Sequence, residues 1–355
     1  MAVTLIQFPG GKSGQFKRIQ SLMPDHECFV EGFGGSGVVT LNKEPAEVDV
    51  YNDLDEELVH FFIVFREATD RLCNWLDDVP YSCSQYEDFV NEFYGKANEA
   101  PPEDNLPGQT LTDNLVTGDD ISYNNVRRAG IFFFLRYSQF GAKYHGRAGF
   151  GRSKVQNGAQ TYANARERLR DFSGSWDHVT IECGSYEELI EVYDGEKTLY
   201  YFDPPYLGTE GYYRKSDFSH ETFIEHLKEI DGYVIVSYDD LPEELERMVA
   251  EEDRWNKTVE ESTNFIDSGI RGSGTDTIET VVTNFDPRDE AGYHSQNQSS
   301  LHDLTQTKEY SENGEEETIT LFDLDKDEDE DTDTVMLFDD VVEDDPAEDW
   351  LDNAD

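Results

Sequence analysis

The sequence has few basic residues, few cysteines and no long apolar run. Of its 355 residues, 28 are Lys or Arg and 78 are Asp or Glu, which gives a formal net charge of -50 at pH 7. A strongly anionic body repels phosphate, so at first sight this composition argues against a nucleic-acid-binding protein. The four cysteines form no CxxC pair, which argues against a zinc site or a disulfide framework. Apolar runs such as 131–135 are far shorter than the roughly 20 residues of a membrane span, so we expect a cytoplasmic protein without a membrane segment.

The sequence does contain enough apolar material for a folded core. Hydrophobic residues make up 37% and aromatic residues 13%, which excludes uniform disorder. The acid is unevenly spread: residues 287–355 hold 25 acidic and three basic residues, and we predict that this tail is disordered. Two tail segments, 318–323 and 334–339, both end in Leu-Phe-Asp. They are either a duplicated docking motif, loosely similar to the peptides by which archaeal replication proteins dock to a sliding clamp, or hydrophobic islands in a solubilising tail.

Short apolar strands alternate with helices over much of the remaining chain. Strands are predicted at 28–33, 47–51, 179–183, 199–202, 233–237 and 278–284, and helices at 56–76, around 131–135, and at 162–172, 186–193 and 220–230. This alternation predicts an α/β fold with a mostly parallel sheet. The interval 61–178 breaks the alternation, so we predict an inserted helical domain there, with a surface loop at 95–118. Residues 1–60 and 179–286 would then form the sheet domain.

A glycine-rich segment follows the first predicted strand. Residues 32–37 satisfy the GxGxxG pattern, and Asp53 lies about 20 residues further on, after the next strand. Glycines let a backbone turn tightly and approach a nucleotide, while an acid at the next strand end can hold a ribose. This pattern alone leaves three readings open: a dinucleotide oxidoreductase, an S-adenosylmethionine enzyme and a plain glycine-rich turn.

A second motif, Asp203-Pro-Pro-Tyr206, follows the apolar strand at 199–202. Two consecutive prolines remove two amide donors and stiffen the turn, so its carbonyls stay free to accept hydrogen bonds. Asp203 and the Pro204 carbonyl can accept from a planar amine, and Tyr206 can stack on its ring. The alternative is that this segment is only a Pro-Pro turn at a strand end, without a binding role. The glycine loop upstream makes this alternative less favoured.

Together these motifs resemble those of the DNA adenine amino-methyltransferases of the Dam type, class D12, alpha group. Residues 8–13 are similar to the N-terminal cofactor motif of that family, and 29–37 to its glycine-rich cofactor loop. Asn52-Asp53 falls at the position of its ribose-binding acid, and Asp203–Tyr206 matches its catalytic DPPY motif. The order of the motifs is also that of the family, and 236–239 and 280–285 match its late strands. The resemblance therefore implies a Rossmann-like methyltransferase sheet.

The resemblance also implies S-adenosylmethionine as cofactor, with Lys12 beside its methionine moiety. The implied cofactor-binding residues are Phe8, Gly10, Gly11, Lys12, Glu31, Phe33, Gly34, Gly35, Gly37, Asp53, Ser185, Tyr186 and Asp203, and the implied catalytic residues are Asp203, Pro204, Pro205 and Tyr206. The chain departs from the family pattern in two places. Gly32 stands where the family has a proline, and Ser185-Tyr186 stands where it has Asp-Phe, which leaves the adenosyl contact at 185–186 open.

One interval reverses the acidic character of the chain. Residues 127–170 hold ten basic residues and one acid, with aromatic residues and glycines interleaved, and we call this interval the basic window. Such a composition suits a loop that follows phosphates while side chains reach base edges. The candidate DNA-binding residues are Arg127, Arg128, Arg136, Lys143, Arg147, Arg152 and Lys154. The alternative is a basic helix whose charges pair with acidic neighbours; in the resembling family, this interval houses the target-recognition region.

The implied reaction is direct methyl transfer from S-adenosylmethionine to the amino nitrogen of adenine in double-stranded DNA, after the base is flipped out of the helix. Neither a covalent nucleophile nor a metal ion is expected, and we expect a monomer. Three alternatives stay open: an enzyme that methylates adenine in RNA or the amino group of cytosine, a catalytically idle DNA-binding module and, more distantly, the oxidoreductase.

The charge can also reflect the solvent. An acid-rich body with 16 Arg and 12 Lys suggests a halophilic source, a haloarchaeon or its virus. At about 1 M salt the Debye length is only about 3 Å, so repulsion between the body and phosphate is screened.

Overall fold

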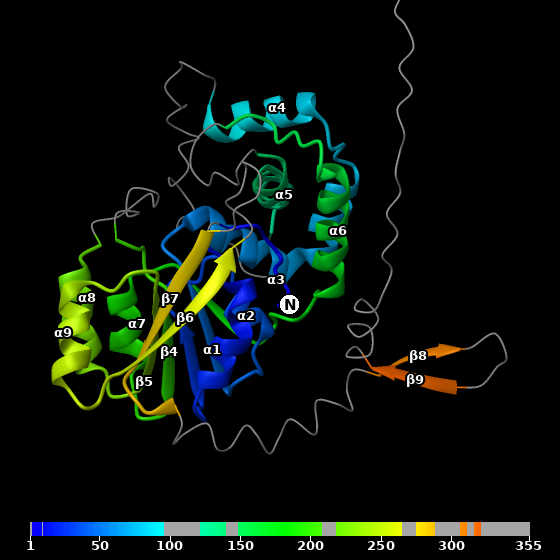
Figure 1. Cartoon of the computed structure of the whole chain (residues 1–355). Helices are drawn as coiled ribbons and strands as arrows, with labels where there is room; N and C mark the ends of the chain where they lie inside the picture. Colours follow the sequence, from blue (N-terminus) through cyan, green and yellow to red (C-terminus); the bar gives the residue numbers. More distant parts are fainter. Residues whose placement is uncertain are drawn as a thin grey trace, which may run out of the picture. The chain divides into compact units, whose positions relative to one another are not determined.

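A seven-stranded sheet organises the first part of the chain in the computed structural model (Figure 1). The structure describes residues 2–8, 10–95, 121–139, 148–207, 218–264 and 275–287, together with a separate strand pair at 306–310 and 316–320. The chain divides into two compact units, 1–295 and 296–355. The sheet and all described helices belong to the first unit.

The strands follow the order β3-β2-β1-β4-β5-β7-β6. The bounds of the sheet strands are β1 Cys28–Glu31, β2 Val48–Asn52, β3 Val179–Glu182, β4 Thr198–Phe202, β5 Tyr233–Tyr238, β6 Asn256–Asn264 and β7 Thr275–Thr283. The five strands from β3 to β5 are parallel, whereas β7 is antiparallel to both β5 and β6. The predicted mostly parallel α/β sheet is confirmed. From β1 the chain continues to β2 and β3 on one side, and from β4 it continues to β5 on the other side. The boundary between β1 and β4 is therefore a topological switch point.

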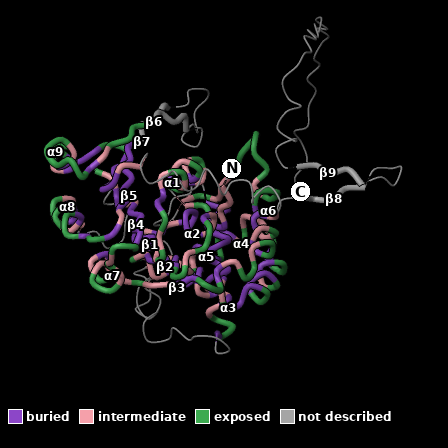
Figure 2. Tube along the Cα trace, turned by 90° about the horizontal axis from the view of Figure 1, so that it is seen from below, coloured by how far each residue is buried: buried purple, intermediate pink, exposed green. Residues whose placement is uncertain are grey.

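Helices cover both faces of the sheet because successive strand residues point to opposite sides. Val30, Tyr200 and Val234 pack with α7 Tyr186–Tyr193, α8 His220–Glu229 and α9 Glu243–Glu251. Phe29 and Leu199, one residue earlier in their strands, pack instead with α1 Phe16–Leu22 and α2 Val38–Asn42. The same two layers flank the sheet in Figure 1, and Figure 2 shows the central strands buried between them. Strands buried on both faces explain the nearly continuous apolar runs that predicted them.

Four helices lie between β2 and β3 in sequence: α3 Glu56–Asp77, α4 Cys83–Tyr94, α5 Tyr123–Ser138 and α6 Gly158–Asp171. We call them the helical layer. Their apolar faces share one core, which also includes Tyr51 of β2 and Val179 of β3. Asp55 caps α3, because its side chain accepts hydrogen bonds from the amides of Glu57 and Leu58. The described residues of this interval are thus largely helical, and their core is continuous with the edge of the sheet.

Several elements differ from the prediction. The helix around 131–135 extends over all of α5, and α1, α2, α4 and α9 were not predicted. The strand β6 was also missed, because the sequence NKTVEESTN has no apolar alternation. The predicted loop at 95–118 lies almost wholly outside the described residues.

The acidic tail is described only in part. It contains an antiparallel strand pair, β8 Gln306–Tyr310 and β9 Glu316–Thr320, where we predicted disorder without a strand period. The rest of the tail, including the segment 334–339, lies outside the described residues. None of the helices in the described ranges is long and apolar enough to cross a membrane.

Candidate active site

The site lies where the parallel strands end at their carboxyl edge. The glycine loop, residues 32–37, follows β1, and Asp203–Tyr206 follows the neighbouring β4. Asn52-Asp53 closes β2, and Ser185-Tyr186 follows β3. In open α/β sheets, ligands bind in the crevice outside the carboxyl ends of the strands, at the switch point. The fold therefore brings the predicted cofactor and catalytic motifs to one edge.

The glycine loop packs closely on the end of β2. The Gly32 amide donates to the Tyr201 carbonyl at 3.0 Å, and the Gly34 amide donates to the Asn52 carbonyl at 2.7 Å. A Cβ on Gly34 would lie 2.2 Å from the ring of Tyr51, so only glycine fits there. Gly37, at a φ of +63°, has the left-handed conformation that glycine favours.

The lysine loop at 8–14 lies against the glycine loop. A Cβ on Gly35 would approach the ring of Phe8 to 3.3 Å, and a Cβ on Gly11 would approach Ser36 Oγ to the same distance. Gly10 has a φ of +76° and open space around it. The structure thus places Phe8 and Gly11 beside the glycine loop.

Asn52 joins three strand ends. Its Nδ2 donates to the carbonyls of Gly32 and Gly184 at 2.9 and 3.0 Å, and its Oδ1 accepts from the Gly184 amide at 2.8 Å. The loops after β1 and β3 are therefore held to the end of β2 by one buried amide. The sequence analysis treated Asn52 only as the neighbour of Asp53. Asn52 could have been recognised from the sequence as a polar residue at the end of a buried strand.

Asp53 carries the acidic charge at the end of β2. Its Oδ2 accepts from the Gly35 amide and its Oδ1 from the Asp55 amide, both at 2.8 Å. Burial, reinforced by the charge of Asp55, raises the pKa of Asp53 to about 6. A carboxylate has about four lone-pair positions, so Asp53 retains acceptor capacity for the hydroxyls of a ribose.

Glu31 ends β1 and is buried. Its Oε2 accepts from the Thr40 amide at 3.0 Å and from the Thr40 hydroxyl. Burial raises the pKa of Glu31 to about 8 against these hydrogen bonds. In this structure Glu31 fixes the start of α2 behind the glycine loop.

Lys12, Asp203 and Tyr206 form the polar centre of the site. Lys12 Nζ lies 3.0 Å from Asp203 Oδ1, and the Tyr206 hydroxyl donates to the same oxygen at 3.0 Å. Lys12 also donates to the Tyr206 hydroxyl and lies 4.9 Å from the centre of its ring. Burial raises the pKa of Asp203, while the positive charge of Lys12 opposes this shift. Lys12 thus contacts two members of the DPPY motif, a contact that the sequence did not predict.

Aromatic side chains surround this centre. Phe33 packs against Tyr186, Phe202 and Phe218, with ring centres 5.6–6.0 Å apart. The Tyr186 hydroxyl is 3.0 Å from His226 Nδ1. Ser185 is the N-cap of α7, where its Oγ accepts from the Glu188 amide. Both residues of the pair 185–186 therefore have structural contacts here.

The basic window is largely paired within the fold. Arg127 Nη2 lies 2.7 Å from Glu92 Oε2, and Arg128 Nε lies 2.9 Å from Glu57 Oε2. Arg136 is 2% exposed and donates to the Tyr94 hydroxyl and to Gln139 Oε1, which places it inside the helical layer rather than on a surface that meets DNA. On α6, three further arginines have protein partners: Arg166 and Arg170 pair with Asp77, and Arg168 donates to the Thr4 carbonyl and to Tyr137.

Among the described basic side chains of the window, two are both exposed and outside any ion pair. Arg152 and Lys154 lie in the segment before α6, and Arg152 has Cys83 Sγ at 3.3 Å as its hydrogen-bond partner. Within the described residues, neither forms an ion pair. Lys143 and Arg147 lie outside the described residues. The structure thus supports the paired-helix alternative for much of the window and leaves Arg152 and Lys154 as the candidates without an ion pair among its described residues.

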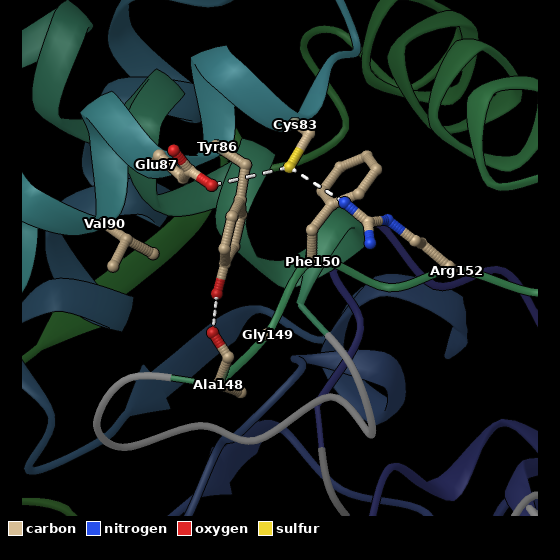
Figure 3. A pocket seen from close by; sticks show the side chains of 8 residues that line it. All are labelled: Cys83, Tyr86, Glu87, Val90, Ala148, Gly149, Phe150 and Arg152. Atoms are coloured by element: carbon tan, nitrogen blue, oxygen red, sulfur yellow. Dashed lines mark hydrogen bonds between the residues drawn. The ribbon is translucent and has the colours of Figure 1, made fainter. Parts of the chain in front are cut away.

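A pocket of about 380 Å³ opens between α4 and residues 148–152 (Figure 3). Cys83 lies between Glu87 and Arg152, and Tyr86 donates to the Ala148 carbonyl. The pocket belongs to the helical layer, whereas the catalytic motif lies at the strand ends. An isolated antiparallel bridge joins Phe150, which lines the pocket, to Gln139 at the end of α5.

The residues of the sheet edge fit S-adenosylmethionine. The glycine loop is closely packed at Gly34, where a side chain would clash with Tyr51. Asp53 is a buried acid that can accept hydrogen bonds from ribose hydroxyls, and Lys12 is a cation that can attract a carboxylate. The carboxylate of Asp203, the first residue of the DPPY motif, lies beside Lys12 at this edge.

Comparisons with known proteins agree with this arrangement. Residues 8–262 match the protein family described as D12 class N6 adenine-specific DNA methyltransferase. The chain is 25% identical over 232 residues to the DNA N-6-adenine-methyltransferase of Escherichia phage P1, which covers 61% of this chain and 26% of the relative.

Two other relatives show a similar level of identity. Type II methyltransferase M.MjaIII of Methanocaldococcus jannaschii is 26% identical over 215 residues, 57% of this chain and 68% of the relative. Modification methylase LlaI of Lactococcus lactis subsp. lactis is 25% identical over 211 residues, 59% of this chain and 30% of the relative. The chain thus spans less than a third of two of these relatives and about two thirds of the other.

Proposed function

The chain belongs to the D12 class N6 adenine-specific DNA methyltransferase family, and from this premise we propose that it transfers the methyl group of S-adenosylmethionine to the exocyclic amino group of adenine in double-stranded DNA. The observation that carries the proposal is the position of Asp203–Tyr206, at the end of β4 and next to the glycine loop of β1. The order of the motifs along the chain supports the Dam-type alpha group within the family.

The cofactor supplies an electrophilic sulfonium methyl group when bound. Asp53 would accept hydrogen bonds from its ribose, and the glycine loop would allow close approach of its backbone. Lys12 would provide a cation near the methionine carboxylate. Tyr186 would line the adenosyl side, while Ser185 keeps its role as the cap of α7.

The target amine would be held by the DPPY motif. Asp203 and the Pro204 carbonyl would accept its two hydrogens, and Tyr206 would pack on the purine ring. Acceptors fixed before the reaction stabilise the positive charge that develops on the nitrogen, and orientation in line with the methyl group lowers the entropic cost. Because the amino group lies within the base pair, the adenine would be flipped out of the helix at a cost of a few kcal/mol.

We assign DNA binding to residues 61–178, which include most of the helical layer. Residues 1–60 and 179–286 would form the catalytic domain. Arg152 and Lys154 are the described cations that support this proposal, since they are exposed and form no ion pair in the part of the chain that the structure describes. Lys143 and Arg147 would join them from the adjoining segment. Arg127 and Arg128 would have to leave their carboxylate partners first.

The composition suggests the setting. We propose a monomeric enzyme of a high-salt cytoplasm, from a haloarchaeon or its virus, in which screening removes repulsion between the acidic body and DNA. The tail at 287–355 would then solubilise the enzyme or dock it to a protein partner such as a clamp.

The test is a methyl-transfer assay with labelled S-adenosylmethionine on unmodified duplex DNA, followed by mass spectrometry of the nucleosides. We expect N6-methyladenine as the product. N4-methylcytosine, or methylation of RNA alone, would replace this proposal with one of the related amino-methyltransferases. DNA binding without methyl transfer, across a range of salt concentrations, would instead favour an idle DNA-binding module.

A further inference from the structure

The side chain of Lys12 is directed at the catalytic carboxylate. Its Nζ is 3.0 Å from Asp203 Oδ1, and the exposed fractions of the two side chains are 7% and 19%. Lys12 also donates to the hydroxyl of Tyr206 and lies over its ring. Lys12 begins the short 3-10 helix η1 Lys12–Gly14, which precedes α1, whereas its two partners come from the turn after β4. A charged contact this close, in a largely water-excluded place, acts strongly on both groups.

The two carboxylate oxygens of Asp203 are used differently. Lys12 and Tyr206 both contact Oδ1. No described residue donates a hydrogen bond to Oδ2. The contacts therefore fix the rotation of the carboxylate and leave Oδ2 for another donor. A planar amine in the site is a donor of that kind.

The charges around Asp203 make this contact important. The negative charge of Asp239 opposes the ionisation of Asp203, and Glu31 and Tyr238 are two further titratable groups that interact with it electrostatically. Burial also raises the pKa of Asp203 and is the largest influence on it. Lys12 and the hydroxyl of Tyr206 act the other way. Lys12 is the one cation among these neighbours.

We propose that Lys12 is a positioning residue for Asp203, which holds Oδ1 and keeps the carboxylate ionised so that Oδ2 accepts a hydrogen from the target amine. This inference rests on the proposed function and deepens it, because it gives Lys12 a role in the chemical step beside any contact with the cofactor. The two roles differ in what they affect. A cofactor contact sets the Kd for S-adenosylmethionine, whereas a contact with Asp203 sets the pH range of catalysis.

The test is the pH profile of kcat for Lys12→Met, a substitution that keeps the length of the side chain and removes its charge. At saturating cofactor, we expect kcat near neutral pH to fall roughly 100-fold. The acidic limb of the profile should move upward by about one pH unit or more, so part of the lost rate returns at alkaline pH. Lys12→Arg keeps the charge and should leave the limb in place. Lys197→Met, which removes a lysine from an exposed ion pair with Glu27, is the matched control and should match wild type.

A second measurement is independent of catalysis. In protein labelled with carbon-13 at the aspartate carboxyl groups, the Asp203 signal is assigned by its loss in Asp203→Asn. Its titration midpoint, measured without cofactor, should rise in Lys12→Met and stay unchanged in Lys197→Met. If wild type methylates DNA but Lys12→Met only raises the cofactor Kd, with the limb and the midpoint unmoved, the inference is wrong and the proposed function stands. If wild type transfers no methyl group, the proposed function fails, and an unmoved midpoint would overturn the Lys12 contact as well.

Discussion

Lys12 and Asp203 are far apart in the sequence and form an ion pair, whereas Arg127 and Arg128 are adjacent in the sequence and pair with carboxylates on different helices. The first pair is brought together by strand order, because β4 returns beside β1 and ends at the same edge. The second pair is separated by helix geometry, since neighbouring residues on a helix point about 100° apart. Charge that is clustered in the sequence is therefore dispersed in the helical layer, and charge that is scattered in the sequence converges at the sheet edge.

The largest expected effect comes from the sheet edge. Asp203→Ala should lower methyl transfer at least about 1,000-fold, because the amine loses the carboxylate that orients it and stabilises its charge. The Kd for S-adenosylmethionine, measured by calorimetry, should change little. Appreciable residual turnover would contradict the assignment of Asp203. Asp240→Ala, an exposed acid near the end of β5, serves as the control for a lost negative charge.

In the helical layer, the largest effect should be on folding. Arg136→Ala should lower the free energy of unfolding by about 2–4 kcal/mol, because it removes a buried side chain together with the hydrogen bonds that it donates to Tyr94 and Gln139. Urea unfolding measures this. Arg152→Ala, at an exposed position in the same basic window, should stay within about 0.5 kcal/mol of wild type. Equal losses in the free energy of unfolding for the two substitutions would contradict the conclusion that Arg136 is buried in the fold and Arg152 is not.

These two regions also show what the sequence could predict. The strands β1, β4 and β5 were predicted because buried parallel strands have continuous apolar runs, and DPPY was found because its residues are contiguous. The pairing of Lys12 with Asp203 depends on strand order over a long separation, so no local pattern encodes it. In the helical layer, α4 carries Tyr86, Phe89 and Val90 at helical spacing and could have been found. The burial of Arg136 could not, because a local excess of positive charge does not tell which helix face each arginine occupies.

A smaller effect tests the packing of the cofactor loop. Gly34→Ala adds a Cβ that would lie 2.2 Å from the Tyr51 ring, so the loop or the ring must shift. We expect a loss of about 1–3 kcal/mol in the free energy of unfolding and weaker cofactor binding. Gly14→Ala is the matched control, because a Cβ there has open space around it. If both variants bind the cofactor like wild type, the tight packing of the loop has no role in binding.

The buried acid at the sheet edge should make stability depend on pH. Glu31 has a pKa of about 8 in the folded protein against 4.5 for the free group, so between these values the folded state holds a proton that the unfolded state has lost. Stability should therefore fall as pH rises from about 5 to 8, with Glu31 contributing up to about 1.4 kcal/mol per pH unit. Glu31→Gln should show a shallower decline in urea unfolding at several pH values. Glu27→Gln, at an exposed carboxylate, should keep the wild-type slope; a Glu31→Gln slope equal to wild type would mean that Glu31 is ionised in the fold.

The smallest effect concerns Arg152 and Lys154, the two described cations of the window that are exposed and form no ion pair. Replacing both in Arg152→Ala/Lys154→Ala should weaken DNA binding about tenfold at low salt and reduce the slope of log K against log salt by about 2, since each phosphate contact contributes about one unit. Arg127→Ala/Arg166→Ala removes the same charge from side chains that already pair with Glu92 and Asp77, so its salt slope should match wild type. Fluorescence anisotropy with a labelled duplex measures both. If the paired arginines change the slope as much as the exposed cations do, their ion pairs open when DNA binds, and the whole basic window faces the duplex despite its pairing in the free protein.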